Sequence, residues 1–247
     1  MNKYKALSIS LMLLLVPTAY AADIALPGIN VTIGQGGTEQ VATALKVLIG
    51  ITVLSLAPAL LIVMTSFTRI IIVLSILRHA LGMQQTPPNT VLVSLALLLT
   101  IFNMAPTFRA IDQHAFRPYM EGRIGTELAL KEATKPFKDF MVRQTREQDL
   151  MAMYDISKTE RPQRLEDIDM MLLIPSFLLS ELRVAFQIGF IVFLPFLLID
   201  IVVSSILMSM GMMMVPPMMI SLPIKILVFV LIDGWNILAV SLINSFK

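Results

Sequence analysis

Long apolar segments separated by polar turns dominate the chain. Two lie in the first half, from Val41 to Leu81 and from Thr90 to Phe108, and two in the last third, from Leu172 to Leu207 and from Ser221 to Phe246. A helix needs about 20 mainly apolar residues to cross the hydrocarbon core of a bilayer. The pattern therefore predicts an all-α membrane protein.

Two turns join these segments in pairs. Glycine and adjacent prolines, which end helices, stand at both turns, and Gly82-Met83-x-x-x-Pro87-Pro88 matches Gly211-Met212-x-x-x-Pro216-Pro217 at an offset of 129. Apolar residues upstream of the turns also match, which makes an internal repeat of moderate strength. We expect two helical hairpins, over residues 41–108 and 172–247, with these four prolines at their tips.

A polar region separates the two hairpins. Of the 36 Asp, Glu, Lys and Arg residues, 25 lie between Arg109 and Arg183. Phe137 and Phe140 recur there at helical spacing, which predicts a small helical domain over residues 109–171. The two rings are expected to form its core, with an assembly surface as the alternative. Acidic and basic residues nearly balance, which argues against nucleic acid as a partner.

The N-terminus has the pattern of a secretory signal. Two lysines precede a short apolar run and an Ala-Tyr-Ala site, so residues 1–21 are interpreted as a cleavable signal peptide, with an uncleaved span as the alternative. Residues 22–40 are expected to form a flexible tail outside the cytoplasm. Arg69 and Arg78 flank the first turn, and the positive-inside rule then places that turn in the cytoplasm and residues 109–171 outside.

The second turn is rich in methionine. Seven of the chain's 18 methionines lie between Met208 and Met219. Methionine is unbranched and adaptable, so a cluster at a hairpin tip can fill space around irregular surfaces, although methionines also serve as ordinary packing. The candidate flexible tip comprises Met208, Met210, Gly211, Met212, Met213 and Met214.

Two opposite charges lie at matched distances from this turn. Asp200 stands twelve residues before Met212 and Lys225 thirteen after it, roughly 18 Å along each helix. A lone charge at the bilayer centre costs about 3 kcal/mol, so a buried ion pair is predicted. Alternatively, each charge meets a neighbouring subunit or solvent. Glu181 and Arg183 are expected near the outer boundary, in a subunit-interface ion pair or in a transport role.

The sequence lacks the motifs of common catalytic sites. It contains no cysteine and two histidines far apart, His79 and His114. It has no HExxH, GxSxG, P-loop or GxGxxG motif. We therefore expect neither an enzyme nor a metal or cofactor site.

Two blocks of sequence resemble the FliP family of membrane proteins. They are TSFTRIIIVLSILRHALGMQQTPPN (65–89) and PSFLLSELRVAFQIGFIVFLPFLLIDIVVSSILMSMGMMMVPP (175–217). The resemblance covers nearly everything from Leu45 onward. It implies a flagellar type III export gate in the bacterial inner membrane, with counterparts in virulence injectisomes.

The resemblance also implies partners and roles. Five copies of the subunit would join FliQ and FliR and other export-apparatus proteins in the basal body, forming the portal for unfolded flagellar proteins. The family's methionine-rich loop, a proposed gasket, corresponds to Met208, Met210, Met212, Met213 and Met214, and its buried acid and base to Asp200 and Lys225. Two other functions stay open, an assembly scaffold without a gate and a proton-coupled transporter using Asp200, Lys225 and Asp233.

Overall fold

A computed structural model describes residues 38–162, 164–212 and 214–246, and these are helical with connecting turns and no strand. The prediction of an all-α protein is confirmed. The chain divides into two units, one ending at Leu56 and one beginning at Ala57, and each is described by itself. The signal peptide predicted for 1–21 and the tail up to residue 37 lie outside the described residues.

The apolar stretch expected from Val41 to Leu81 forms two helices. Helix α2 spans Thr38–Val63 and α3 spans Phe67–Ala80. In the first unit, α2 exposes apolar side chains such as Leu48 and Ile49. The break follows from Thr65, whose hydroxyl donates to the Ile62 carbonyl (2.9 Å) and accepts from the Phe67 N–H (3.4 Å). Such local bonds compete with the helical ladder.

Helix α4 (Asn89–Ile111) continues through a π-helical turn, η1 (Asp112–Phe116), into the short α5 (Arg117–Met120). The polar region then forms α6 (Thr126–Gln144), α7 (Glu147–Ser157) and the 3-10 turn η2 (Leu165–Asp167). Both α6 and α7 pack against the start of the next helix, α8. The polar region is therefore attached to the membrane-type helices.

Helix α8 (Met170–Ser209) is the longest element, with 40 residues. Its length is about 60 Å, roughly twice the thickness of a bilayer core. The Asp169 carboxylate caps it by accepting from the Met171 N–H (3.0 Å). Gly189 lets α3 approach closely, because a Cβ there would lie 2.3 Å from Ile76 Cδ1.

The last apolar stretch is bent by 66° between α9 (Met218–Leu231) and α10 (Gly234–Asn244). Asp233 adopts a left-handed conformation (φ 52°) at the bend. The Phe229 ring packs so tightly on Gly234 that a Cβ would lie 2.2 Å from it. The sequence predicts residues 221–246 as a single apolar segment of the second hairpin, and the structure divides this segment into two helices at the left-handed Asp233.

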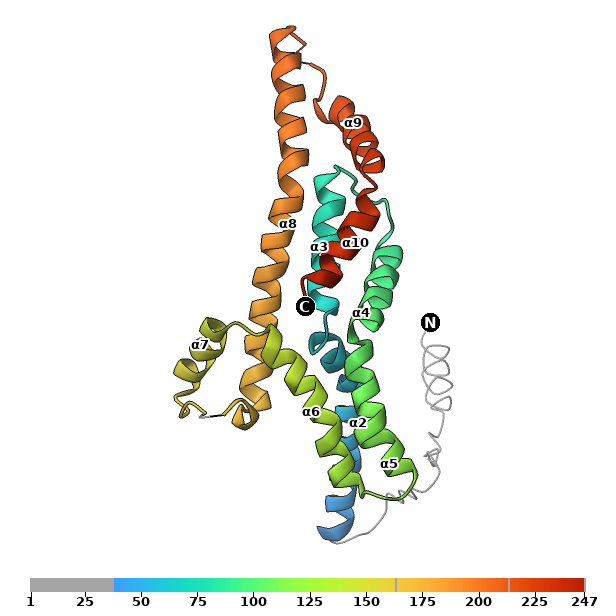
Figure 1. The fold of residues 1–247 in the computed structure, drawn as a ribbon, viewed down its shortest axis with the longest axis vertical. Helices are drawn as coiled ribbons and strands as arrows, with labels where there is room; N and C mark the ends of the chain where they lie inside the picture. Colours follow the sequence, from blue (N-terminus) through green and yellow to red (C-terminus); the bar gives the residue numbers. More distant parts are fainter. Residues whose placement is uncertain (1–37, 163, 213, 247) are drawn as a thin grey trace, which may run out of the picture. The chain divides into compact units, whose positions relative to one another are not determined.

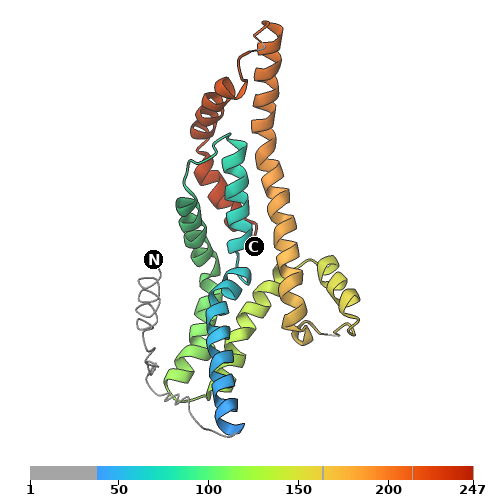
Figure 2. The same cartoon turned by 180° about the vertical axis from the view of Figure 1, so that it is seen from behind.

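Helix α3 lies between α8 and α4 in the second unit, as both views show (Figures 1 and 2). Its buried residues, among them Ile70, Val73 and Leu77, form the centre of the core. Among the described residues, two helical segments are long and apolar enough to cross a membrane, Asn89–Met120 and Met170–Ser209, and the bent pair α9–α10 could make a third. The protein is thus an all-α protein with candidate membrane-spanning helices.

Candidate gate and the ion pairs behind it

The second tip presents a cluster of exposed methionines. Helix α8 ends at Ser209, and α9 begins at Met218. Met214 is 97% exposed and Met219 is 72% exposed, and the other exposed members are Met208, Met210, Met212 and Met218. Met213 lies outside the described residues. Gly211 sits at the turn with φ +73°, a conformation that favours glycine.

The two hairpin turns share their backbone hydrogen bonds. At the first, the Gly82 N–H donates to the His79 carbonyl (2.9 Å) and the Met83 N–H to Arg78 (3.2 Å). At the second, Gly211 donates to Met208 (3.1 Å) and Met212 to Leu207 (3.0 Å). Every residue is displaced by 129. This is the Schellman arrangement, with a left-handed glycine just after each helix.

The repeat continues into the returning helices. Helix α4 begins at Asn89 and α9 at Met218, again 129 apart. The buried face repeats as well, because Leu92, Ala96 and Thr100 are buried in α4, and Ser221, Lys225 and Phe229 in α9. Lys225 therefore occupies the place of an alanine in the first hairpin.

A side-chain clasp distinguishes the first tip. Arg78 Nη1 donates to the Asn89 Oδ1 atom (2.6 Å) and to the Pro87 carbonyl (3.3 Å). The clasp fastens the end of α3 to the start of α4. The equivalent residues of the second hairpin are Leu207 and Met218, whose side chains cannot make these bonds.

The structure brings Asp200 and Lys225 together across the second hairpin. Lys225 Nζ donates to Asp200 Oδ2 (2.6 Å) and to the carbonyl of Ala80 (3.0 Å). The lysine side chain is 4% exposed and the aspartate 36%. A cation at the last carbonyls of α3 is also favoured by the helix dipole. Lys225 thus ties α8 and α9 to the end of α3, next to the first tip.

A second ion pair, missed by the sequence analysis, lies toward the other end of α8. Glu181 is paired with Arg69 of α3, and both are buried. Arg69 Nε donates to Glu181 Oε2 (2.9 Å). Glu181 therefore meets a partner inside its own subunit. This corrects its assignment to a subunit interface, because a fully buried carboxylate cannot face a neighbouring chain. Arg69 is likewise more than a topology signal.

Arg69 contacts three further residues around this pair. It donates to the Ser245 carbonyl (2.8 Å) and to Gln144 Oε1 (3.1 Å). Its guanidinium lies 3.8 Å from the centre of the Phe246 ring, a cation–π contact. The Gln144 side chain donates in turn to the Phe246 carbonyl (2.9 Å). The arginine thereby joins α3, α6, α8 and the end of the chain.

The other candidate interface residues fall into two groups. Arg183 is half exposed, and its guanidinium lies 3.7 Å from Asp149 of α7. Phe140 is buried and packs against Phe177 and Phe246, whereas Phe137 is partly buried and packs edge-on against Phe108. The two phenylalanines therefore belong to the core that joins α6 to α4 and α8.

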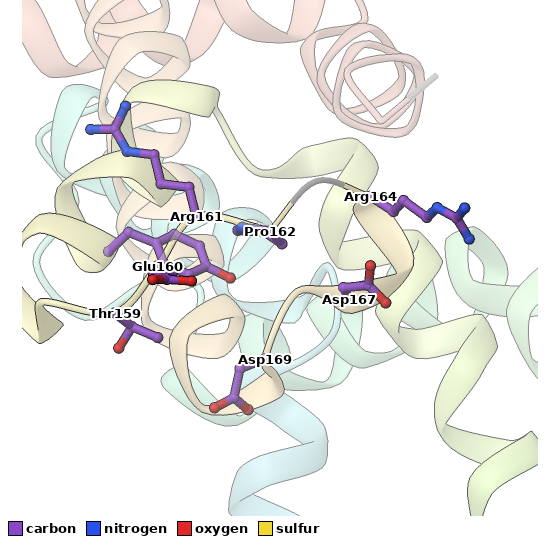
Figure 3. Close-up of a pocket in the computed structure, with 8 residues that line it drawn as sticks. Thr159, Glu160, Arg161, Pro162, Arg164, Asp167 and Asp169 are labelled. Carbon is purple, nitrogen blue, oxygen red and sulfur yellow. The ribbon is translucent and has the colours of Figure 1, made fainter.

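A polar pocket of about 510 Å³ lies beside the end of α7 (Figure 3). Arg161, Arg164 and Asp169 line it, but they point in three different directions rather than toward one ligand. Within the described ranges, no three His, Asp or Glu side chains are grouped as metal ligands would be. The features that stand out chemically are therefore the tips and the ion pairs.

Comparison with known sequences places the chain. The sequence profile of the FliP family matches residues 50–242. The chain belongs to the FliP family. The flagellar biosynthetic protein FliP of Bacillus subtilis is 52% identical over 208 residues, covering 84% of this chain and 94% of its own. Proteins of that name from Pectobacterium carotovorum and Cereibacter sphaeroides are 46% and 47% identical, covering 95% and 99% of this chain and 90% and 84% of theirs.

The part matched by the FliP family contains both tips and the two acids of α8 with their basic partners. It ends at residue 242, just before Ser245 and Phe246, which contact Arg69. Residues 1–49, including the predicted signal peptide and tail, lie outside the match. The family assignment therefore rests on the helical hairpins and the region between them.

Proposed function

We propose that this chain is a core subunit of the flagellar type III export gate. In this proposal it assembles in several copies with FliQ and FliR in the bacterial inner membrane. Together they form the portal through which unfolded flagellar proteins leave the cytoplasm. Membership of the FliP family supports a flagellar role, since the relatives are named flagellar biosynthetic proteins.

The main observation in support of a gate is the exposed methionine tip. Large apolar side chains gather at the end of α8 and the start of α9, beyond the point where Lys225 is anchored to Ala80. Met218 stands seven residues from Lys225, which is about 10 Å of helix. Several such tips meeting on an axis would fill it with adaptable thioether side chains, and a dry apolar constriction stops ions.

Opening requires the tip to move while its base stays in place. Gly211 supplies a backbone position that tolerates other conformations, and the clasp of the first tip has no counterpart here. The Asp200–Lys225 pair would hold α8 and α9 in register behind the moving part. Pro216 and Pro217 would limit the motion at the start of α9, because each fixes its own φ.

The topology belongs to the same proposal. We infer that both tips face the cytoplasm and that residues 109–171 and the N-terminus are periplasmic, with residues 1–21 removed as a signal peptide. The domain division predicted from the sequence, at 21, 40, 108 and 171, stays part of the proposal. We expect no catalytic role, cofactor or nucleic-acid partner for this subunit.

Ion conductance of the inner membrane tests the gate. The protein is produced with FliQ and FliR, and Met212, Met213 and Met214 are changed together to alanine. We expect a large ion leak from a complex of unchanged native mass, because three long side chains per copy are lost from the seal.

Two controls sharpen this experiment. Met83→Ala changes the equivalent of Met212 in the first tip and is expected to cause no leak. Replacing the three methionines with leucine keeps the apolar volume and is expected to keep most of the seal. An intact complex with unchanged conductance in the alanine variant would favour an assembly scaffold, and lost proton coupling without a leak would favour a transporter.

A further inference from the structure

The first tip carries a cation with unused donors. Both partners of Arg78 in the clasp are neutral oxygens, those of Pro87 and Asn89. Its Nε atom is buried and out of a neighbour's reach, whereas its Nη2 atom is not buried and donates no hydrogen bond among the described residues. A guanidinium has five N–H donors in a planar fork that fits a carboxylate. Arg78 can therefore bind an anion without giving up its clasp.

Asp200 carries an unused acceptor at a similar height. Only its Oδ2 atom is bonded to Lys225, and the side chain is 36% exposed. Lys225 also bonds the Ala80 carbonyl, and Ala80 stands two residues after Arg78. Two residues of helix correspond to about 3 Å. The arginine and the aspartate thus lie within one helical turn of the same level.

The two groups lie on different flanks of the second unit. Arg78 faces the start of α4, as its bonds to Pro87 and Asn89 require. Asp200 belongs to α8, on the other side of α3 (Figures 1 and 2). Exposed apolar side chains stand close to both in sequence, Val91 two residues after Asn89 and Leu197 and Ile201 within three residues of Asp200.

We propose that Arg78 of one copy donates to the Asp200 carboxylate of a second copy of this chain. The inference rests on the proposed function, because it assumes several copies in one complex. A contact between two different flanks is head-to-tail, and a head-to-tail contact closes into a ring when the rotation permits. In the ring, each Asp200 accepts from its own Lys225 and from the neighbouring subunit's arginine.

A second copy fits these groups better than a lipid headgroup does. A phosphate would bind Arg78 and leave the free oxygen of Asp200 without a donor. One head-to-tail contact satisfies both groups and covers the exposed apolar side chains close to them in sequence. Because these charges lie among apolar residues, pairing them also offsets their desolvation.

Cysteine cross-linking tests the contact, since the chain has no cysteine of its own. A Gln85→Cys chain and a Ser204→Cys chain, with different tags, are produced together with FliQ and FliR and oxidised. Gln85 belongs to the clasped tip, and Ser204 lies one turn beyond Asp200 on the same helix face. We expect a disulfide-linked dimer that contains both tags.

Ser205→Cys is the matched control. It lies at nearly the same height but about 100° round the helix, so its yield of mixed dimer with Gln85→Cys is expected to be several-fold lower. Adding Arg78→Gln to the Gln85→Cys chain should lower the yield with Ser204→Cys several-fold. Adding Asn89→Ala, which removes only an internal partner of Arg78, should leave that yield unchanged.

The possible results separate this contact from the gate itself. Equal yields from Ser204→Cys and Ser205→Cys, or an undiminished yield with Arg78→Gln, would refute the contact. A multi-copy native mass without any mixed dimer would also refute it while leaving the proposed function standing. A native mass with a single copy of this chain would overturn both.

Discussion

The two hairpins have the same type of backbone turn at their tips but differ in the side-chain contacts that stabilise them. Their turns have the same hydrogen bonds and a left-handed glycine at equivalent positions, 129 residues apart. In the first hairpin, the Arg78–Asn89 clasp joins α3 to α4, and the buried Arg69 of α3 is paired with Glu181 of α8. The second lacks the clasp and extends its methionines beyond the Lys225 anchor. A duplicated hairpin can therefore become a fixed support in one copy and a free tip in the other.

We expect the largest loss of stability from a change in the buried Arg69–Glu181 ion pair. Arg69→Met leaves Glu181 buried without its cation, and breaking such a pair costs about 3–5 kcal/mol. We expect the complex to be lost or to melt at a much lower temperature in detergent. Arg69→Met combined with Glu181→Gln should recover part of this loss, because no unpaired charge stays buried. A double variant no more stable than the single one would contradict the role of the pair.

We expect the second-largest loss of stability at Lys225, which joins the two hairpins. Lys225→Met removes the bonds to Asp200 and Ala80, but Asp200 is partly exposed and water can replace some of the loss. We expect a cost of about 2–3 kcal/mol, less than for Arg69. Thermal melting of the purified complex measures it, with Lys225→Met/Asp200→Asn as the control expected to lose less. If Lys225→Met lowered the stability more than Arg69→Met does, the expected order of the two ion pairs would be wrong.

The two turn glycines offer the smallest and most direct comparison. Alanine at a left-handed position costs about 1 kcal/mol, so Gly82→Ala and Gly211→Ala should destabilise the complex by similar small amounts. Their effects on function should differ, since only the second tip is proposed to move. We expect Gly211→Ala to reduce export of flagellar subunits clearly and Gly82→Ala to reduce it little. Equal export by the two variants would remove the distinction between support and gate.

Much of the architecture follows from local information in the sequence. Helical hairpins are apparent from apolar segments and glycine–proline turns, because chain reversal depends on residues close together in the chain. Asp200 and Lys225 stand at nearly equal numbers of residues from the second turn, and the two are bonded in the structure. In a helical hairpin, equal numbers of residues from the turn correspond to equal distances along the two helices, because each residue adds the same rise.

The sequence by itself determined the helical class, the turns, the repeat and the segregation of charge, all of which depend on composition and short-range order. Only the tertiary structure decided that Arg69 meets Glu181, 112 residues away, and that Lys225 reaches the Ala80 carbonyl, 145 residues away. Periodicity gives no information on which distant side chains meet. The partner of a buried charge is set by how helices pack, and packing is a property of the whole fold.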